Sequence, residues 1–313
     1  MAILEALFPM RKSAGSFTFK RRKADGRIIV TQKIDYFHNH RTTLSMKNKL
    51  TMINARAMYR YLKPQMRENI EADGSNRNPY LTYLHLNKPI TRCWLPQEES
   101  RQGNAILEPH YISNGTLIPV LCQLDDEDRM LTDIKLGLTT FEGVTVGEWS
   151  RDLLKHNRHY QPNDLLKFVY LRQESSHGSH CDFHRIKDES CVVMLEESDE
   201  RLLSEVVDTT LWGVLDGCLA MRKPLSYAAA TVVHLHPEEF PLYHDRWTVF
   251  NALRQHLAAG LPLSTFVKPD TRPLTYKVSR QQLMCVNPLI DEYSSEDCFA
   301  RAASEFGPIR DCM

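Results

Sequence analysis

The pattern of hydrophobic positions predicts one long amphipathic helix near the start of the chain. Between about Thr43 and Lys63, apolar residues recur at the helical period. Thr43 or Ser45 can cap the start of this helix, and Pro64 is expected to end it. The apolar stripe consists of Met46, Leu50, Ile53, Ala57 and Tyr61, widened by Met58 and Leu62. The basic residues on roughly the opposite side are Lys49, Arg56, Arg60 and Lys63.

The residues before this helix have the pattern of a β-hairpin. "FTFKRR" alternates in character from Phe17 onward, and "RIIVTQKI" is rich in β-branched residues. The Asp25-Gly26 pair between them is typical of a tight turn, because glycine supplies the positive φ that such a turn needs. An isolated hairpin is marginally stable in water, so we expect its apolar face to cover another part of the protein.

From about Gly103 onward, short strand-like runs follow one another without regular βαβ alternation. These runs are "AILEPHYI", "LIPVLCQL", "DIKLGLTTF", "DLLKFVYLRQ", "CDFHRIKD", "CVVMLEE", "LWGVLDGCLAM", "AAATVVHLH", "TYKVS" and "QQLMCVN". Short helices are predicted for "TVGEWSRDLLKHN", capped by Thr145, for "HDRWTVFNALRQHLAAG", and for "SSEDCFARAASEFG", capped by Ser294 or Ser295. The pattern predicts an α+β, β-dominated fold, with a basic β-hairpin plus helix followed by antiparallel sandwich-like sheet domains.

The chain is long enough for more than one domain. Residues 1–70 are expected to form the basic hairpin-helix module, and residues 71–100 a linker and connecting segment that begins with the polar, turn-rich "EADGSNRNP". Residues 101–205 would form a β-rich domain. Residues 206–313 would form a second β-rich domain with a C-terminal helix.

Basic and acidic residues are unevenly distributed, although the formal net charge is zero. Residues 1–63 contain 14 Lys and Arg and 3 Asp and Glu, a net charge of +11, whereas the remainder contains 25 and 36, a net charge of −11. Such blocks are typical of a protein that binds a polyanion, or whose basic segment docks on an acidic neighbouring copy. The residues expected to bind the polyanion or partner are Lys20, Arg21, Arg22, Lys23, Arg27, Lys49, Arg56, Arg60 and Lys63.

The sequence lacks the usual motifs of nucleotide-binding and hydrolytic enzymes. It contains no G-x-x-x-x-G-K-[ST] loop, no G-x-G-x-x-G loop and no G-x-S-x-G elbow. The eight cysteines include no C-x-x-C pair and lie mostly in apolar runs, which favours reduced thiols packed as small hydrophobic side chains. We therefore predict no catalytic residue, no cofactor and no metal.

Two histidine clusters are the strongest candidates for metal chemistry. "HGSHCDFH" contains His177, His180 and His184 beside Cys181, but its spacing crosses a loop and a strand start, where the rings do not gather. "VVHLHPEEF" places His234 and His236 on one strand face, yet a proline interrupts the strand before the acidic residues that follow. Neither spacing matches an established metal-binding pattern. The first cluster is therefore interpreted as a polar loop, and the second as a weak candidate for a metal site.

The sequence also predicts the compartment. No apolar run approaches the roughly 20 residues that a membrane-spanning helix needs, so no membrane partner is expected. The first residues, "MAILEALFPMRKSAG", place their positive charges after a short apolar patch. A secretory signal has the reverse order, so we expect an unprocessed chain that is cytoplasmic at synthesis.

Several phrases occur in a fixed order along most of the chain: "GSFTFKRRKADGRIIVTQK" with "NARAMYRYLKP", "EPHYISNGTLIPV", "VGEWSRDLLKHNRHYQPNDLLKFVYL", "LWGVLDGCLAM" and "KVSRQQLMCVNPLIDEYSS". In these phrases the chain resembles an uncharacterised protein family of Bacteroidota genomes and their mobile elements. The first fifteen residues fall outside the resemblance. It implies a domain of unknown function with no established activity, and its association with phages and mobile elements favours a role in a virion or another assembly.

These observations predict a non-enzymatic structural or assembly protein, phage or mobile-element encoded, that forms a homo-oligomer or binds another structural protein. Its basic N-terminal module would contact an acidic neighbouring subunit or a nucleic acid. The alternative is a sequence-nonspecific nucleic-acid-binding protein, and a metal-dependent enzyme is a distant third.

Overall fold

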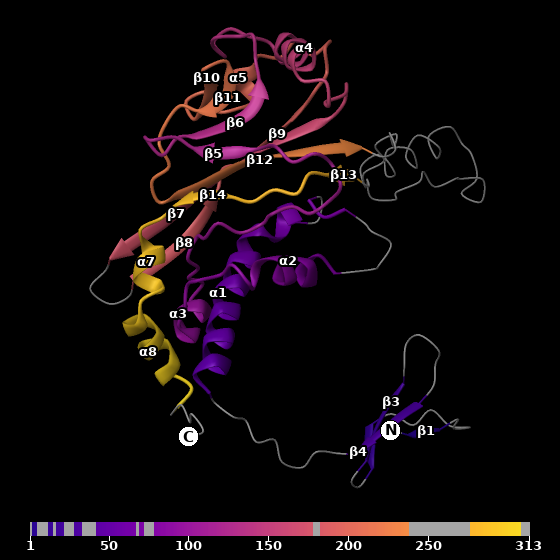
Figure 1. The fold of residues 1–313 in the computed structure, drawn as a ribbon, viewed down its shortest axis with the longest axis vertical. Helices are drawn as coiled ribbons and strands as arrows, with labels where there is room; N and C mark the ends of the chain where they lie inside the picture. The colour runs from indigo at the N-terminus through magenta and orange to yellow at the C-terminus, as the bar shows by residue number, and fades with distance from the viewer. Residues whose placement is uncertain are drawn as a thin grey trace, which may run out of the picture. The chain divides into compact units, whose positions relative to one another are not determined.

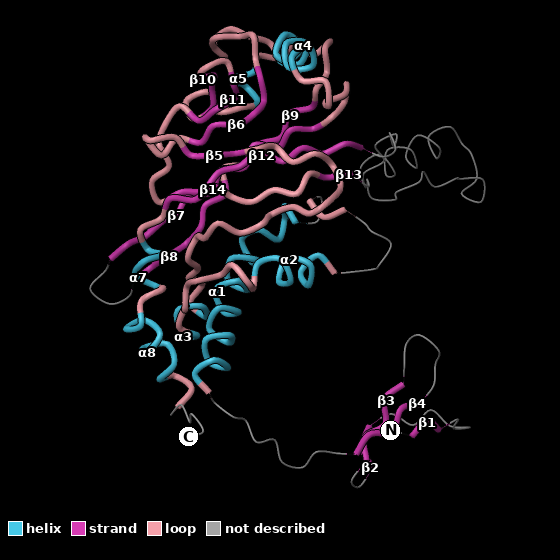
Figure 2. The backbone as a smooth tube through the Cα atoms, in the orientation of Figure 1, coloured by secondary structure: helices cyan, strands magenta, loops and turns pink. Residues whose placement is uncertain are grey.

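The computed structural model describes residues 2–4, 12–14, 17–21, 28–32, 42–66, 69–71, 78–177, 182–237 and 276–307. The chain divides into an N-terminal unit, Met1–Ser45 with Ile309–Met313, and a main unit, Met46–Pro308. Helices and antiparallel sheets occur together, with the sheets forming the centre of the main unit (Figure 2). The predicted α+β, β-dominated fold class is confirmed.

The described strands of the N-terminal unit form one antiparallel sheet in the order β1-β4-β3-β2. They are β1 (Ala2–Leu4), β2 (Lys12–Ala14), β3 (Phe17–Arg21) and β4 (Ile28–Gln32). Strand β3 pairs with β4 from Phe17 opposite Gln32 to Arg21 opposite Ile28. This pairing confirms the predicted hairpin, whose Asp-Gly turn lies outside the described residues.

The main unit contains a six-stranded and a four-stranded sheet, both antiparallel. The larger sheet consists of β7 (Leu165–His177), β8 (Asp182–Asp188), β9 (Cys191–Met194), β12 (Ala228–Pro237), β13 (Tyr276–Val278) and β14 (Met284–Val286). The smaller sheet has the order β10-β11-β6-β5 and consists of β5 (Cys122–Leu124), β6 (Met130–Lys135), β10 (Trp212–Leu215) and β11 (Cys218–Met221). The larger sheet contains strands that precede residue 205 in the sequence and strands that follow it. The predicted domain boundaries remain predictions.

Alternate residues of the central strands β7 and β12 belong to two hydrophobic cores. Val169 and Val233 pack in one core with buried residues of α1 (Thr43–Met66), whereas Phe168 and Val232 pack in the other with Trp149. This division follows from the period of two along a strand, because successive side chains point to opposite faces. The six-stranded sheet therefore has a helical layer on one face and the smaller sheet on the other (Figure 1).

The helical layer holds α1, α2 (Pro79–Asn87), α3 (Gln97–Arg101), α7 (Leu289–Tyr293) and α8 (Glu296–Ser304), and the other side holds α4 (Val146–His156) and α5 (Leu203–Val206) (Figure 1). Two predicted helices are confirmed. Helix α4 follows a capping box between Thr145 and Glu148, and Ser295 caps α8. The predicted helix at residues 244–260 lies outside the described residues. Helices α2 and α3 occupy the segment that we predicted as a connection.

Helix α1 differs from its prediction at both ends. The Oγ1 of Thr42 accepts a hydrogen bond from the backbone N–H of Ser45 (3.2 Å), so Thr42, rather than Thr43 or Ser45, caps the helix. Pro64 lies inside the helix, and the prediction that it ends the helix is wrong. Proline removes one backbone hydrogen bond, but Leu62 and Met66 around it are completely buried, and their burial stabilises the last turn.

The predicted strand at residues 105–112 is also wrong. Asn54 of α1 accepts a hydrogen bond from the backbone N–H of Ile106 (2.9 Å) and donates one to its carbonyl (3.0 Å). Gln173 of β7 accepts from the N–H of Leu107 (2.8 Å) and donates to the carbonyl of Ala105 (3.1 Å). Because a side-chain amide has both a donor and an acceptor, these two amides pair with the backbone as a neighbouring strand would.

Candidate anion-binding groove

The exposed face of α1 is basic, as the sequence predicts. The opposite face packs against the protein core through five side chains that are at most 3 % exposed: Met46, Leu50, Ala57, Met58 and Leu62. The four predicted basic residues of this helix are exposed: Lys49, Arg56, Arg60 and Lys63. Burial of one face thus determines which side chains the other face presents to solvent.

Three of these basic side chains line a groove of about 410 Å³ together with Arg101, the last residue of α3. The basic lining residues are Lys49, Arg56, Arg60 and Arg101, and the others are Met52, Ile53, Gln97 and Ser100. Lys63, although exposed, does not line this groove. Several guanidinium groups around one concave surface favour a ligand with more than one negative charge, because each guanidinium can donate two parallel hydrogen bonds to a carboxylate or phosphate.

Helix α3 is held against α1 by polar contacts that also position Arg60. The Nη2 of Arg60 donates to the carbonyl oxygen of Ser100 (2.7 Å) and lies 2.9 Å from its Oγ. The hydroxyl of the neighbouring Tyr61 donates to the carbonyl of Gly103 (2.6 Å). Both of these hydrogen bonds use Nη2 of Arg60, and neither involves its Nε or Nη1. The guanidinium is therefore oriented before a ligand arrives, which lowers the entropic cost of binding.

The positive charge of the groove is poorly balanced by acidic side chains. Lys49 and Arg56 form no ion pair with any residue that the structure describes, and the Nζ of Lys49 lies 3.6 Å from the ring centroid of Phe306. Arg101 pairs with Glu98 (3.3 Å), but both side chains are more than half exposed. An exposed pair of this kind contributes little free energy, so Arg101 can exchange Glu98 for a ligand at small cost.

The remaining predicted binding residues belong to the N-terminal hairpin. Lys20 and Arg21 lie in strand β3, whereas Arg22, Lys23 and Arg27 lie outside the described residues. Arg101 was missed because it follows two glutamates in "QEESR", where sequence alone indicates an ordinary mixed surface.

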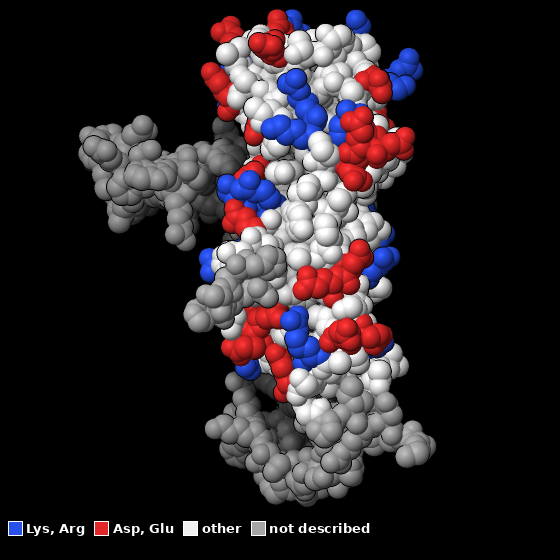
Figure 3. Space-filling model, turned by 90° about the vertical axis from the view of Figure 1, so that its left-hand side faces the viewer, with Lys and Arg blue, Asp and Glu red and all other residues white. Residues whose placement is uncertain are grey.

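The face of the protein drawn in Figure 3 carries both acidic and basic side chains. They lie beside one another in small groups, separated by uncharged surface (Figure 3). A surface of mixed sign produces only a weak field at a distance. In contrast to a surface of mixed sign, the groove has four basic side chains around one concave surface.

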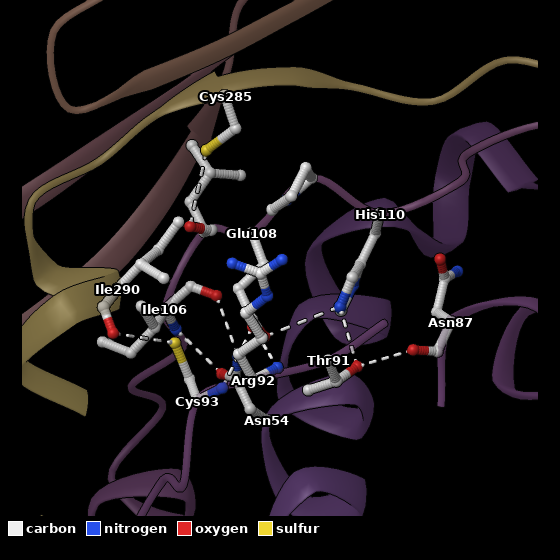
Figure 4. A network of polar contacts seen from close by, with 12 residues as sticks. Asn54, Asn87, Thr91, Arg92, Cys93, Ile106, Glu108, His110, Cys285 and Ile290 are labelled. Atoms are coloured by element: carbon white, nitrogen blue, oxygen red, sulfur yellow. Dashed lines mark hydrogen bonds and ion pairs between the residues drawn. The ribbon is translucent and has the colours of Figure 1, made fainter. Parts of the chain in front are cut away.

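A buried polar network is centred on Glu108 (Figure 4). Its carboxylate accepts hydrogen bonds from the backbone N–H groups of Arg92 (2.6 Å) and Cys93 (3.0 Å), and from Nδ2 of Asn54 (2.6 Å). Burial raises the pKa of Glu108, although these bonds oppose the change. Burial lowers the pKa of His110 to about 3, so its ring is neutral at pH 7 and its 3.6 Å approach to Glu108 is not an ion pair. Both side chains are inaccessible to solvent, so we assign the network to structure.

The histidines of "VVHLHPEEF" share one strand face, as predicted, and both contact Asp164. The Nε2 of His234 lies 2.7 Å from Oδ2 of Asp164, and Nδ1 of His236 lies 2.6 Å from Oδ1. Burial raises the pKa of Asp164, but hydrogen bonds from His234 and His236 outweigh it, and the net shift is downward. Because an ionised carboxylate only accepts, both contacting nitrogens carry a hydrogen. Asp164 is not predictable from the sequence, because no spacing rule connects "PND" with a strand 70 residues later.

The other histidine cluster is only partly described. His184 is buried and its Nδ1 lies 3.0 Å from Oγ of Ser175, while His180 and Cys181 lie outside the described residues. His177 ends strand β7. Within the described ranges, no group of three or more His, Cys, Asp or Glu side chains is placed to hold a metal ion.

Comparisons with known proteins add no family to these observations. No family model, no curated protein and no solved structure matches the chain. In the part of the chain that the structure describes, no helix is both long and apolar enough to cross a bilayer. The groove is therefore judged on its own geometry and charge.

Proposed function

We propose that this chain is a non-enzymatic assembly protein that binds an acidic macromolecular partner in the groove between α1 and α3. The observation that carries the proposal is the convergence of Lys49, Arg56, Arg60 and Arg101 on one concave surface. Two of them, Lys49 and Arg56, have no ion-pair partner among the described residues. Unpaired charges at one surface are retained at a cost in self-repulsion, which a bound polyanion removes.

The chemistry of the groove favours a protein partner. Met52 and Ile53 line it between the basic side chains, and both are partly buried, so they offer an apolar surface as well as charge. An acidic peptide segment that carries an apolar side chain would satisfy both kinds of surface at once, as the mixed core and rim of protein interfaces do. The resemblance to a mobile-element family adds the proposal that this partner belongs to a phage or mobile-element particle.

A nucleic acid is the second candidate, because arginine binds phosphate and carboxylate with the same geometry. Lys20 and Arg21 of strand β3 belong to the same basic stretch of sequence. Binding to a nucleic acid releases counterions, so its affinity would fall by orders of magnitude between about 50 and 200 mM salt when many phosphates are contacted.

Fluorescence anisotropy with two labelled probes, polyglutamate and a single-stranded oligonucleotide, tests the proposal. We expect purified full-length protein to bind polyglutamate, and Arg56→Glu to weaken that binding about tenfold or more. Lys63→Glu is the matched control, since Lys63 is exposed on the same helix but does not line the groove. Binding of the oligonucleotide alone would favour the second candidate. If neither probe binds at low salt, the proposed function is wrong.

A further inference from the structure

The main unit has an acidic surface whose chemistry is the counterpart of the groove. Four glutamates lie within ten residues of one another: Glu196, Glu197 and Glu200 between β9 and α5, and Glu205 within helix α5. Glu197, Glu200 and Glu205 are exposed and Glu196 is half-buried. We call these four residues the acidic ridge.

The glutamates of the ridge, like Lys49 and Arg56 of the groove, form no ion pair among the described residues. The one basic residue within the ridge, Arg201, is held by Asp199 through three hydrogen bonds of 2.6–3.1 Å. Asp199 is the nearest partner of Arg201, whose charge also acts on Glu196 and Glu205. The four carboxylates of the ridge outnumber this one cation, so the ridge keeps a net negative charge that can attract an external cation.

The backbone of the ridge is fixed on the start of helix α4. The N–H of Val146 donates to the carbonyl of Arg201 (2.9 Å), and the N–H of Gly147 donates to that of Asp199 (2.8 Å). Gly147 permits this approach, because a Cβ there would stand 2.5 Å from the carbonyl oxygen of Glu197. A surface that is ordered before binding loses less conformational entropy when it binds.

The ridge also presents the apolar group that the groove can accept. Leu202 is 42 % exposed and directly follows the acidic run. The groove offers Met52 and Ile53 among its basic side chains. Each surface therefore combines an apolar residue with an excess of charge of one sign, and the two signs are opposite, which gives electrostatic and apolar complementarity together.

We propose that the acidic ridge of one copy of this chain binds the groove between α1 and α3 of a second copy. This inference rests on the proposed function and names its partner. Helix α5 lies at the top of Figure 1 and helix α3 towards its lower end, with the six-stranded sheet between them. The ridge therefore reaches a groove only on another copy, and repetition of such a heterologous contact produces a ring or an open chain.

Sedimentation velocity of the full-length protein over a range of concentrations tests this assembly. We expect oligomers that dissociate as salt increases, because the contact is between charges at the surface. Arg56→Glu in the groove and the double variant Glu197→Gln, Glu200→Gln in the ridge should each weaken self-association about tenfold or more. Lys63→Glu and Asp126→Asn are matched controls, exposed and outside both surfaces, and should associate as the wild type does.

Mixing the two variants gives the decisive result. The groove variant keeps an intact ridge and the ridge variant keeps an intact groove, so a mixture should form one-to-one dimers that grow no further. Failure of the mixture to dimerise, or a wild type that stays monomeric at high concentration, would overturn the inference. If polyglutamate still binds the wild type and not Arg56→Glu, the proposed function stands with another acidic partner. If polyglutamate does not bind either, both fail.

Discussion

Asp164 and His234 are 70 residues apart in the sequence, yet Oδ2 of Asp164 lies 2.7 Å from Nε2 of His234, with both side chains at most 4 % exposed. The second oxygen of the same carboxylate accepts from His236. The buried carboxylate of Asp164 thus connects the loop before β7 to the end of β12 through hydrogen bonds. The backbone N–H of Gln161 also donates to this carboxylate (2.8 Å). Removing a charge that satisfies three donors leaves them without an equivalent acceptor, which is costly in a buried position.

Asp164→Asn should therefore destabilise the protein by about 2–4 kcal/mol. The side-chain oxygen of asparagine can accept a hydrogen bond from one imidazole N–H. Its NH₂ group, however, would face the N–H of the other imidazole, and two donors cannot bond to each other. Urea denaturation followed by tryptophan fluorescence measures the difference in the free energy of unfolding. Asp126→Asn makes the same chemical change at an exposed site and should alter stability by no more than about 0.5 kcal/mol. A variant at Asp164 as stable as this control would contradict the assigned role.

His110 should make the stability of the protein depend on pH below neutrality. Its ring is completely buried, with Tyr83 Oη at 2.7 Å, Thr91 Oγ1 at 2.9 Å and Glu108 at 3.6 Å, and burial lowers its pKa from 6.5 to about 3. Between these values the unfolded chain binds a proton at this residue and the folded protein does not. Stability is therefore complete above pH 6.5 and falls as the pH decreases towards 3, by about 1.4 kcal/mol per pH unit from this residue alone.

Urea denaturation between pH 4 and 7 measures this dependence, and His110→Gln isolates it. Glutamine keeps a donor and an acceptor but does not titrate. Burial also raises the pKa of Glu108, which acts in the opposite direction, so the informative quantity is the difference in slope between the two proteins. If the free energy of unfolding of the wild type and of His110→Gln changed equally with pH, His110 would not be buried as a neutral ring.

Asn54→Ala should cost about 3 kcal/mol, because the amide satisfies three buried partners at once. It pairs with both the N–H and the carbonyl of Ile106 and donates to Glu108. Thermal unfolding followed by circular dichroism measures the loss. Asn48→Ala is the matched control on the same helix, because Asn48 is exposed. If both substitutions lowered the melting temperature equally, helix propensity rather than the amide would explain the effect.

The elements that sequence analysis predicted are those whose stability comes from neighbouring residues. The stripe from Met46 to Leu62 predicts both the buried face of α1 and its basic face, and the alternation in β3 and β4 predicts their pairing. The strand predicted at residues 105–112 fails because its backbone pairs with Asn54 and Gln173, which are distant in sequence. Asp164 was missed for the same reason, since only the fold brings it to His234.

Gly147→Ala separates two opposing effects in helix α4. Alanine has the higher helix propensity, by about 1 kcal/mol, so at an open helical position this change would stabilise the protein. At Gly147 the new Cβ would stand 2.5 Å from the carbonyl oxygen of Glu197 and 2.9 Å from that of Asp199. Both atoms belong to the backbone, which cannot rotate away as a side chain can, so the segment that carries the acidic ridge must move.

We therefore expect Gly147→Ala to destabilise the protein by about 1–3 kcal/mol, because the steric cost exceeds the gain in propensity. Urea denaturation measures this change. Lys155→Ala, at an exposed position of the same helix, is the control and should change stability by no more than about 0.5 kcal/mol. Because the ridge rests on Gly147, the variant should also associate more weakly than the wild type at equal concentration. A Gly147→Ala protein that is more stable than the wild type would show that the ridge does not pack against the start of α4.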